Sequence, residues 1–377
     1  MNREGFYHST ALEDYSCGNK VFSLNSEKRI KFPTLWLGHL FNSRPILSEY
    51  FLVEGLFLNA FEIFKKRKIF NQIKTGKSIH HILPVSSKTL ISLDSGGFLF
   101  QKQSNIKLPY SEFITIINNA DPDLVFSLDH PLDPNLNSNE NSKRIQRTLY
   151  NLKKLVSNIQ KIKVIPILHG YTPYQLEVCA KGIHKICGEN IDLIACGSLV
   201  PLMRTAGQIR PGYLKKWNTN SRRIMALRIL KYAKNLFPES KMHVFGIGGT
   251  NIMHLMYLIA DSVDSIGWRW SAAGGMIRIL EVGERYISGR KQSVRWNPNL
   301  NSEDWEKLSQ CRCPICLKNQ ESLKTSFEAR AIHNAYVYQE ETKIARDRIQ
   351  NGSYFNYLKK RMQKNNSIKI LLREFEN

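Results

Sequence analysis

The stretch Leu93-Asp94-Ser95-Gly96-Gly97-Phe98 decides how the rest of the chain is interpreted. Residues 89–93 form a short apolar run of the kind that makes a buried strand. Asp94 comes at the end of that strand, and the glycine pair allows a sharp turn and a close approach by a ligand. A carboxylate in this place is costly to bury unless it is solvated or functional. An Asx-type turn is the plain alternative.

The same pattern recurs along the chain. Further apolar runs end in a small or polar residue and precede a segment compatible with a helix; they are 123–128, 163–168, 192–196, 243–245 and 260–263, with another strand candidate at 30–37. This alternation indicates parallel strands joined by helices, so we expect an α/β fold, a (β/α)8 barrel. A doubly wound open sheet is the alternative. In a barrel the strand carboxyl ends meet at one pocket, here lined by Asp94, Asp129, His169, Gly197, Gly246 and Asp264.

The overall charge points to a polyanionic partner. Across 377 residues there are 54 Lys and Arg against 32 Asp and Glu, a formal net charge of +22. Such an excess favours nucleic acid before membrane, although a lysine-rich bias spread over solvated faces would also produce it. The apolar runs are too short to span a bilayer and residues 1–5 lack an apolar signal core, so we expect a cytoplasmic protein.

Three cysteines and one histidine form a metal-binding pattern. Cys311, Cys313 and Cys316 are spaced C-x-C-x-x-C, which brings three thiolates into one tight turn, and His333 follows after sixteen residues. Three sulfurs and one imidazole make a closed tetrahedral set, so the pattern predicts a structural Zn²⁺ site. A redox motif with a bystander histidine is the alternative.

The remaining segments suggest the domain organisation. We expect a lead-in at 1–28, a catalytic barrel at 29–298, a zinc-binding subdomain at 299–340 and basic C-terminal helices at 341–377, with a break at Asn351-Gly352. Helices are predicted at 48–68, 142–161 and 221–237. Trp268-Arg269-Trp270 combines aromatic rings with a cation, which suits contact with nucleic acid; packing of the tryptophans into the core is the alternative.

Together these motifs resemble the tRNA-guanine transglycosylase superfamily. That family combines a (β/α)8 barrel, a D-S-G-G-F/Y motif and a C-x-C-x-x-C zinc site completed by H-N; here they are Asp94–Phe98, the three cysteines and His333-Asn334. The resemblance covers roughly residues 30 to 360. It implies exchange of a guanine base for a 7-deazaguanine through a covalent nucleotide intermediate.

The resemblance also implies residue roles. Asp264, the second aspartate of the D-x-x-D match, would be the nucleophile that attacks C1′ of the sugar, and Asp94 the general acid/base. Asp129 would accept hydrogen bonds from the base. The other substrate-binding residues would be Ser95, Phe98, His169, Gly197, Phe245 and Gly246, with the two phenylalanines stacking on the base. For His169, packing and hydrogen bonding at its strand end is the plain alternative.

Three segments depart from the pattern of the tRNA enzymes. His169-Gly170-Tyr171 replaces Q-G-G, Cys196–Pro201 replaces G-G-L-A-V-G, and Ile266–Trp270 replaces the P-T-R stretch. The chain therefore looks more like the DNA-modifying, DpdA-like branch, which implies placing 7-cyano-7-deazaguanine into DNA. A tRNA-guanine transglycosylase of the queuosine or archaeosine type, or a non-catalytic accessory subunit, are the alternatives. A homodimer or accessory modification proteins would be the protein partners.

Overall fold

The computed structural model describes residues 22–23, 28–41, 44–97, 108–203, 208–287, 298–363 and 365–376. Phe98, one of the predicted base-stacking residues, lies outside these ranges.

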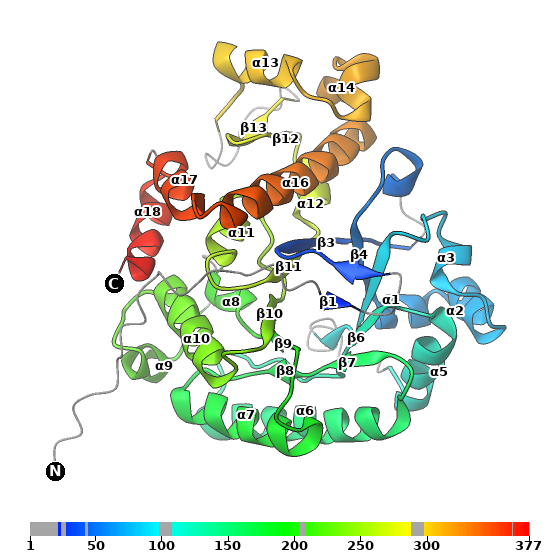
Figure 1. Cartoon of the computed structure of the whole chain (residues 1–377), viewed down its shortest axis with the longest axis vertical. Helices are drawn as coiled ribbons and strands as arrows, with labels where there is room; N and C mark the ends of the chain where they lie inside the picture. The colour runs from blue at the N-terminus through cyan, green and yellow to red at the C-terminus, as the bar shows by residue number, and fades with distance from the viewer. Residues whose placement is uncertain are drawn as a thin grey trace.

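A closed barrel of parallel strands forms the centre of the molecule (Figure 1). The strands are β3 (Thr34–Gly38), β4 (Gly55–Asn59), β5 (Leu90–Asp94), β6 (Leu124–Phe126), β7 (Lys163–Ile165), β8 (Ile167–Leu168), β9 (Leu193–Cys196), β10 (Lys241–Val244) and β11 (Ser262–Ser265). They pair in parallel in the order β7-β6-β5-β4-β3-β11-β10-β9-β8. Only Pro166 separates β7 from β8, so the two edges of the sheet are halves of one strand and the sheet closes. The predicted (β/α)8 barrel is confirmed.

Helices surround the barrel in the order expected of βα units (Figure 1). They are α1 (Ala60–Lys65), α2 (Arg67–Lys74), α3 (Ile79–Ile82), α5 (Tyr110–Ala120), α6 (Ser138–Asn158), α7 (Pro173–Cys187), α8 (Val200–Met203), α9 (Pro211–Lys216), α10 (Arg222–Leu236), α11 (Thr250–Met256) and α12 (Gly267–Ala273). A two-stranded pair, β1 (Phe22–Ser23) and β2 (Arg29–Ile30), precedes them. The helices predicted at 142–161 and 221–237 correspond to α6 and α10. Asn137 begins α6 with a capping box that includes Glu140.

The barrel strands are buried on both faces. Their inward side chains fill the barrel interior, and the residues of this inner cluster include Ile30, Trp36, Leu90, Leu124, Phe126, Ile165, Ile167, Leu193 and Ala195. The outward side chains pack against the surrounding helices in a second, larger cluster. The barrel is therefore a packed core, and only its carboxyl end is left to form a site.

The helix predicted at 48–68 is wrong, because residues 55–59 form strand β4 and α1 and α2 follow it. Leu56 and Leu58 pack outward while Phe57 packs inward, so the strand reads as one apolar run. A run that is apolar on both faces cannot be told from a buried helix by periodicity alone. Asn59 ends the strand and caps α1 by accepting a hydrogen bond from the Glu62 amide.

The C-terminal part forms a second layer that packs against the barrel unit from outside (Figure 1). It contains an antiparallel hairpin, β12 (Met276–Ile279) and β13 (Gly283–Tyr286), and the helices α13 (Ser302–Ser309), α14 (Pro314–Asn319), α15 (Ser322–Thr325), α16 (Phe327–Gln350), α17 (Tyr354–Arg361) and α18 (Asn366–Leu372). The predicted break at Asn351-Gly352 is confirmed, since α16 ends at Gln350 and Gly352 has a φ of +69°. No helix in the described ranges is long and apolar enough to cross a membrane.

Helix α16 joins the two layers. It packs against α12, β12 and β3. Near its end, Arg346 forms an ion pair with Glu54 at 2.8 Å and donates to the Pro33 carbonyl at 3.1 Å, at the amino ends of β4 and β3. The helix continues without interruption through residue 340, where the sequence suggested a domain boundary.

Candidate active site and metal centre

The carboxyl ends of the barrel strands bring three aspartates to one end of the barrel. Asp94 is the last residue of β5, Asp129 follows β6, and Asp264 lies in β11. His169, Gly197 and Gly246 follow β8, β9 and β10 in the same way. All six predicted pocket positions therefore lie at the end where barrel active sites form.

Asp94 combines a local turn with an unusual electrostatic environment. Its Oδ2 accepts the Gly96 amide at 2.9 Å, and Gly96 has a φ of +91°, so the Asx-type turn is present. Burial, together with the negative charges of Asp129 and Asp264, raises the pKa of Asp94 to about 8, although hydrogen bonds from backbone amides lower it in part. A carboxyl group with this pKa can both give and take a proton near neutral pH.

One oxygen of the Asp264 carboxylate is fixed and the other is left open. Its Oδ1 accepts the Gly246 amide at 2.6 Å, where Gly246 has a φ of +67°, and the His243 Nε2 lies 3.4 Å from the same oxygen. Among the described residues no side chain or amide donates to Oδ2. By contrast Asp261, the first aspartate of the D-x-x-D match, forms an ion pair with Lys241 at 2.8 Å and accepts the Met242 amide. Asp264 is thus the one of the pair at the pocket.

Asp129 is held by a hydrogen-bonded chain. The Ser95 hydroxyl donates to its Oδ1 at 3.5 Å, and His169 Nε2 lies 3.1 Å from its Oδ2. The other nitrogen of His169 contacts the Ser198 hydroxyl at 2.8 Å, and that oxygen accepts the Leu132 amide. His169 has 0% of its surface exposed, so it is packed behind Asp129 and orients this carboxylate.

Glycines make room for this chain. A Cβ at position 97 would lie 2.2 Å from the Asp129 Oδ1, and one at position 197 would lie 2.5 Å from the His169 ring. Either methyl group would displace the carboxylate or the ring that orients it. A glycine is therefore required at position 97 of the Asp94–Phe98 motif, because the Asp129 carboxylate from the end of the next strand occupies the space of its Cβ.

Aromatic rings form the floor below the aspartates. Phe245 is partly exposed and packs on Phe126 and His243, with ring centroids 4.9 and 4.8 Å apart. His243 is fully buried and lies parallel to Phe57 at 5.9 Å. Phe245 directly follows β10, so it lies at the same end of the barrel as the aspartates.

The Trp268–Trp270 segment forms part of α12. Trp268 is 1% exposed and its indole N–H donates to the Gly38 carbonyl at 3.2 Å, so the predicted nucleic-acid contact is wrong for Trp268 and the core-packing alternative holds. Arg269 lies over the Phe327 ring at 5.1 Å and donates to the Arg44 carbonyl. Trp270 is 72% exposed and remains available to a partner.

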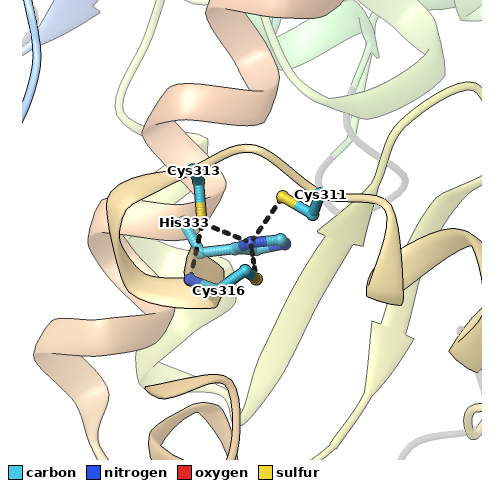
Figure 2. A group of neighbouring side chains, drawn as sticks. All are labelled: Cys311, Cys313, Cys316 and His333. Atoms are coloured by element: carbon cyan, nitrogen blue, oxygen red, sulfur yellow. Dashed lines mark hydrogen bonds between the residues drawn. The ribbon is translucent and has the colours of Figure 1, made fainter. Parts of the chain in front are cut away.

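The cysteine motif and His333 come together as expected (Figure 2). The His333 Nδ1 lies 3.7, 3.3 and 3.5 Å from the sulfurs of Cys311, Cys313 and Cys316, and all four ligand atoms lie within 4.8 Å of one another. Ligands of a tetrahedral zinc ion would be separated by about 3.6 Å, given usual Zn–S and Zn–N bond lengths. The His333 Nε2 contacts the Arg278 carbonyl at 2.8 Å, which places the proton there and leaves the Nδ1 lone pair for a metal. The four residues could therefore hold a metal ion.

Two residues near the site were missed by the sequence analysis. Ser198 orients His169, and His243 lies against Asp264. For His243 a signal existed: in a strand, alternate residues face the same side, so His243 shares a face with Phe245. No comparable signal marks Ser198, whose φ of +68° reflects a turn that only the structure reveals.

Comparison with known proteins gives matches over most of the chain. Residues 54–367 match the model of the family described as queuine tRNA-ribosyltransferase. Three archaeal tRNA-guanine(15) transglycosylases are similar: that of Archaeoglobus fulgidus at 20% identity over 83% of this chain and 59% of its own length, that of Methanocaldococcus jannaschii at 22% over 83% and 44%, and that of Saccharolobus solfataricus at 26% over 73% and 51%. The chain thus spans about half the length of the curated relatives it matches.

Proposed function

Because the chain belongs to the queuine tRNA-ribosyltransferase family, we propose that it exchanges a guanine base in a nucleic acid for a free base through a covalent intermediate on Asp264. The observation that carries this proposal is the pairing of two differently held carboxylates at the barrel's carboxyl end. Asp264 is fixed by an amide with one oxygen open, while Asp94 has its pKa raised to about 8.

The first half of the reaction forms a glycosyl ester. The open Oδ2 of Asp264 attacks C1′ of the target nucleotide, and the bond from C1′ to the guanine nitrogen breaks with its electron pair going to the base. The protonated Asp94 gives its proton to the departing base, which leaves as neutral guanine. The sugar is then joined to Asp264 and Asp94 is ionised.

The second half restores the enzyme. The ionised Asp94 takes a proton from the incoming base, whose nitrogen attacks C1′ and displaces the Asp264 carboxylate. Because Asp94 alternates between acid and base, its pKa must lie near the working pH, and burial beside Asp129 and Asp264 brings it there.

The base would be held beside Asp129. Since Ser95 and His169 orient this carboxylate, its remaining lone pairs can accept the N–H groups of a guanine edge. Phe245 offers a ring for stacking, and Gly197, which carries no side chain, leaves the His169 ring in its place behind Asp129. A 7-deazaguanine such as 7-cyano-7-deazaguanine, which presents the same N–H edge, is the incoming base we propose.

We favour tRNA over DNA as the nucleic acid. The relatives are named for tRNA. The expectation of DNA came from segments that depart from the tRNA-enzyme motifs, and the burial of residues in those segments weakens it. His169, Tyr171 and Trp268 are 0%, 0% and 1% exposed, so they do not report on which polynucleotide lies above the pocket. Trp270 is the exposed residue of those segments with a large aromatic surface, and stacking on it is tolerant of base and sugar type.

The metal centre would be structural. Four protein ligands leave no open position for a substrate, and three thiolates with one imidazole suit Zn²⁺. We propose that the ion holds the β12–β13 hairpin and α14 against α16.

The test is base exchange by the purified full chain. Bulk tRNA and duplex DNA are each incubated with labelled guanine and, separately, with labelled 7-cyano-7-deazaguanine. We expect label in tRNA, no label with Asp264→Asn, and a denaturation-resistant protein–RNA adduct with wild type when no free base is supplied. Label in DNA alone would overturn the choice of tRNA. Absence of label and of adduct with both nucleic acids would overturn the proposed function.

A further inference from the structure

His243 is a buried histidine that lies against the proposed nucleophile. It comes from β10, where Val244 points outward to the helices, so the side chain of His243 enters the barrel interior. It has 0% of its surface exposed and packs among Phe57, Phe126 and Phe245, with ring centroids 4.8–5.9 Å away. These three rings fix the plane of the imidazole.

The two ring nitrogens of His243 have different surroundings. Nδ1 contacts the Ser262 hydroxyl at 3.0 Å. Nε2 is buried and makes no hydrogen bond, but it lies 3.4 Å from the Asp264 Oδ1. A buried polar nitrogen without a partner is costly, so its presence beside a carboxylate calls for an explanation.

The surroundings assign the tautomer. A lone pair on Nε2 would face a carboxylate lone pair at close range, which is repulsive, whereas an Nε2–H faces an acceptor. The Ser262 hydroxyl can supply its proton to Nδ1, which leaves the ring proton on Nε2. A small rotation of the Asp264 carboxylate would then align Nε2–H with Oδ1.

We propose that His243 is a positioning residue for Asp264. Together with the Gly246 amide it holds Oδ1, so that Oδ2 alone is presented to C1′. This inference rests on the proposed function above. His243 gives up no proton in either half-reaction: Oδ2 makes and breaks the bond to C1′, Asp94 carries the proton, and the Nε2–H stays on the ring.

The same contact has a distinct effect on the second half-reaction. In the glycosyl ester Oδ1 is a carbonyl oxygen, and it regains negative charge as the ester breaks. A fixed N–H donor stabilises that developing charge without reorganisation, as donors in an oxyanion hole do. Loss of His243 is therefore expected to slow release of the ester as well as its formation.

The experiment compares His243→Phe with His243→Gln. Phenylalanine keeps an aromatic ring between its neighbours and removes the donor, while the glutamine amide restores an N–H at a similar reach. We expect kcat to fall on the order of 10- to 100-fold in the phenylalanine variant with little change in KM for the free base, and the glutamine variant to recover most of it. The control is Phe126→Leu, which disturbs the same packing without removing a donor. Equal kcat in the wild type and a folded His243→Phe would overturn the proposal, as would no recovery by a folded His243→Gln.

A second readout does not depend on activity. In nitrogen-15 NMR of the wild type, we expect the His243 ring to show a protonated Nε2 and an unprotonated Nδ1, and the Nε2–H signal to move in Asp264→Asn. If wild type exchanges no base but this coupling is seen, the proposed function fails and the contact stands. A proton on Nδ1, or an Nε2–H signal indifferent to Asp264→Asn, would overturn the inference even in an active enzyme.

Discussion

Formation of the covalent adduct should weaken as pH rises through the pKa of Asp94. In the proposed mechanism the first half-reaction needs this carboxyl group protonated, because Asp94 gives a proton to the leaving guanine. With a pKa of about 8, Asp94 is about 90% protonated at pH 7 and about 10% protonated at pH 9. The rate of adduct formation should therefore fall about tenfold between these two pH values.

The assay is single-turnover trapping of the protein–RNA adduct at saturating RNA without free base. RNA binding and circular dichroism are followed over the same pH range, so that neither weak binding nor unfolding is mistaken for the effect. Asp129→Asn provides the second arm: it removes a negative charge that raises the pKa of Asp94, so the fall in rate should move to lower pH.

Two results would refute this reasoning. A rate that is constant or rises from about pH 7 to about pH 9 would show that Asp94 is not the acid with this pKa. A fall in rate at the same pH in wild type and Asp129→Asn would show that another group controls it. The second half-reaction, which needs ionised Asp94, should respond to pH with the opposite sign.

Three further predictions concern the metal, the C-terminal layer and the exposed tryptophan. Cys313→Ala should lose the metal ion proposed at the cysteine cluster and lower the melting temperature by at least about 5 °C, measured by elemental analysis and calorimetry. Cys187→Ala, outside the cluster, should keep the ion. Burial opposes ionisation of Glu341, but His254 and Arg361 hold its pKa well below the usual range. Glu341→Gln should therefore cost about 3–5 kcal/mol of unfolding free energy in denaturant titrations, whereas Glu340→Gln should cost less than about 0.5 kcal/mol. Equal losses in the two variants would contradict this prediction. Trp270→Ala should weaken RNA binding by about 1–3 kcal/mol at unchanged stability, while Trp268→Ala should lose about 3–5 kcal/mol of stability. A loss of stability in Trp270→Ala and a loss of binding alone in Trp268→Ala would contradict this prediction.

The sequence was sufficient for the barrel and for the places where its strands end. Aspartate, histidine or glycine residues mark the ends of these strands in the sequence, as Asp94 and Asp264 do. The close spacing of the three cysteines likewise marks the metal cluster within a few residues. Strand β4 was wrongly predicted as part of a helix, because its apolar residues face both the barrel interior and the helices and the sequence therefore lacks the period-2 alternation of a strand.

What the sequence could not supply were contacts between strands. The contacts of Asp129 with His169 and of Asp264 with His243 join side chains that are distant in sequence and meet only once their strands lie in the sheet. The same holds for Trp268 and Trp270: they are two positions apart on a helix, which places them on different faces, and only the packing of α12 shows which one is buried.

Helix α16 has a consequence for how the molecule comes apart. Its 24 residues extend for about 36 Å. His333 lies near one end, and Arg346, which contacts Glu54 and Pro33 at the amino ends of β4 and β3, lies near the other. Because α16 is held by contacts near both ends, a loss of the contacts at one end should weaken those at the other. We therefore expect the metal cluster and the barrel to unfold in one cooperative transition. Loss of an ion from the cluster would loosen the barrel at the amino ends of β4 and β3, opposite the end that carries the three aspartates.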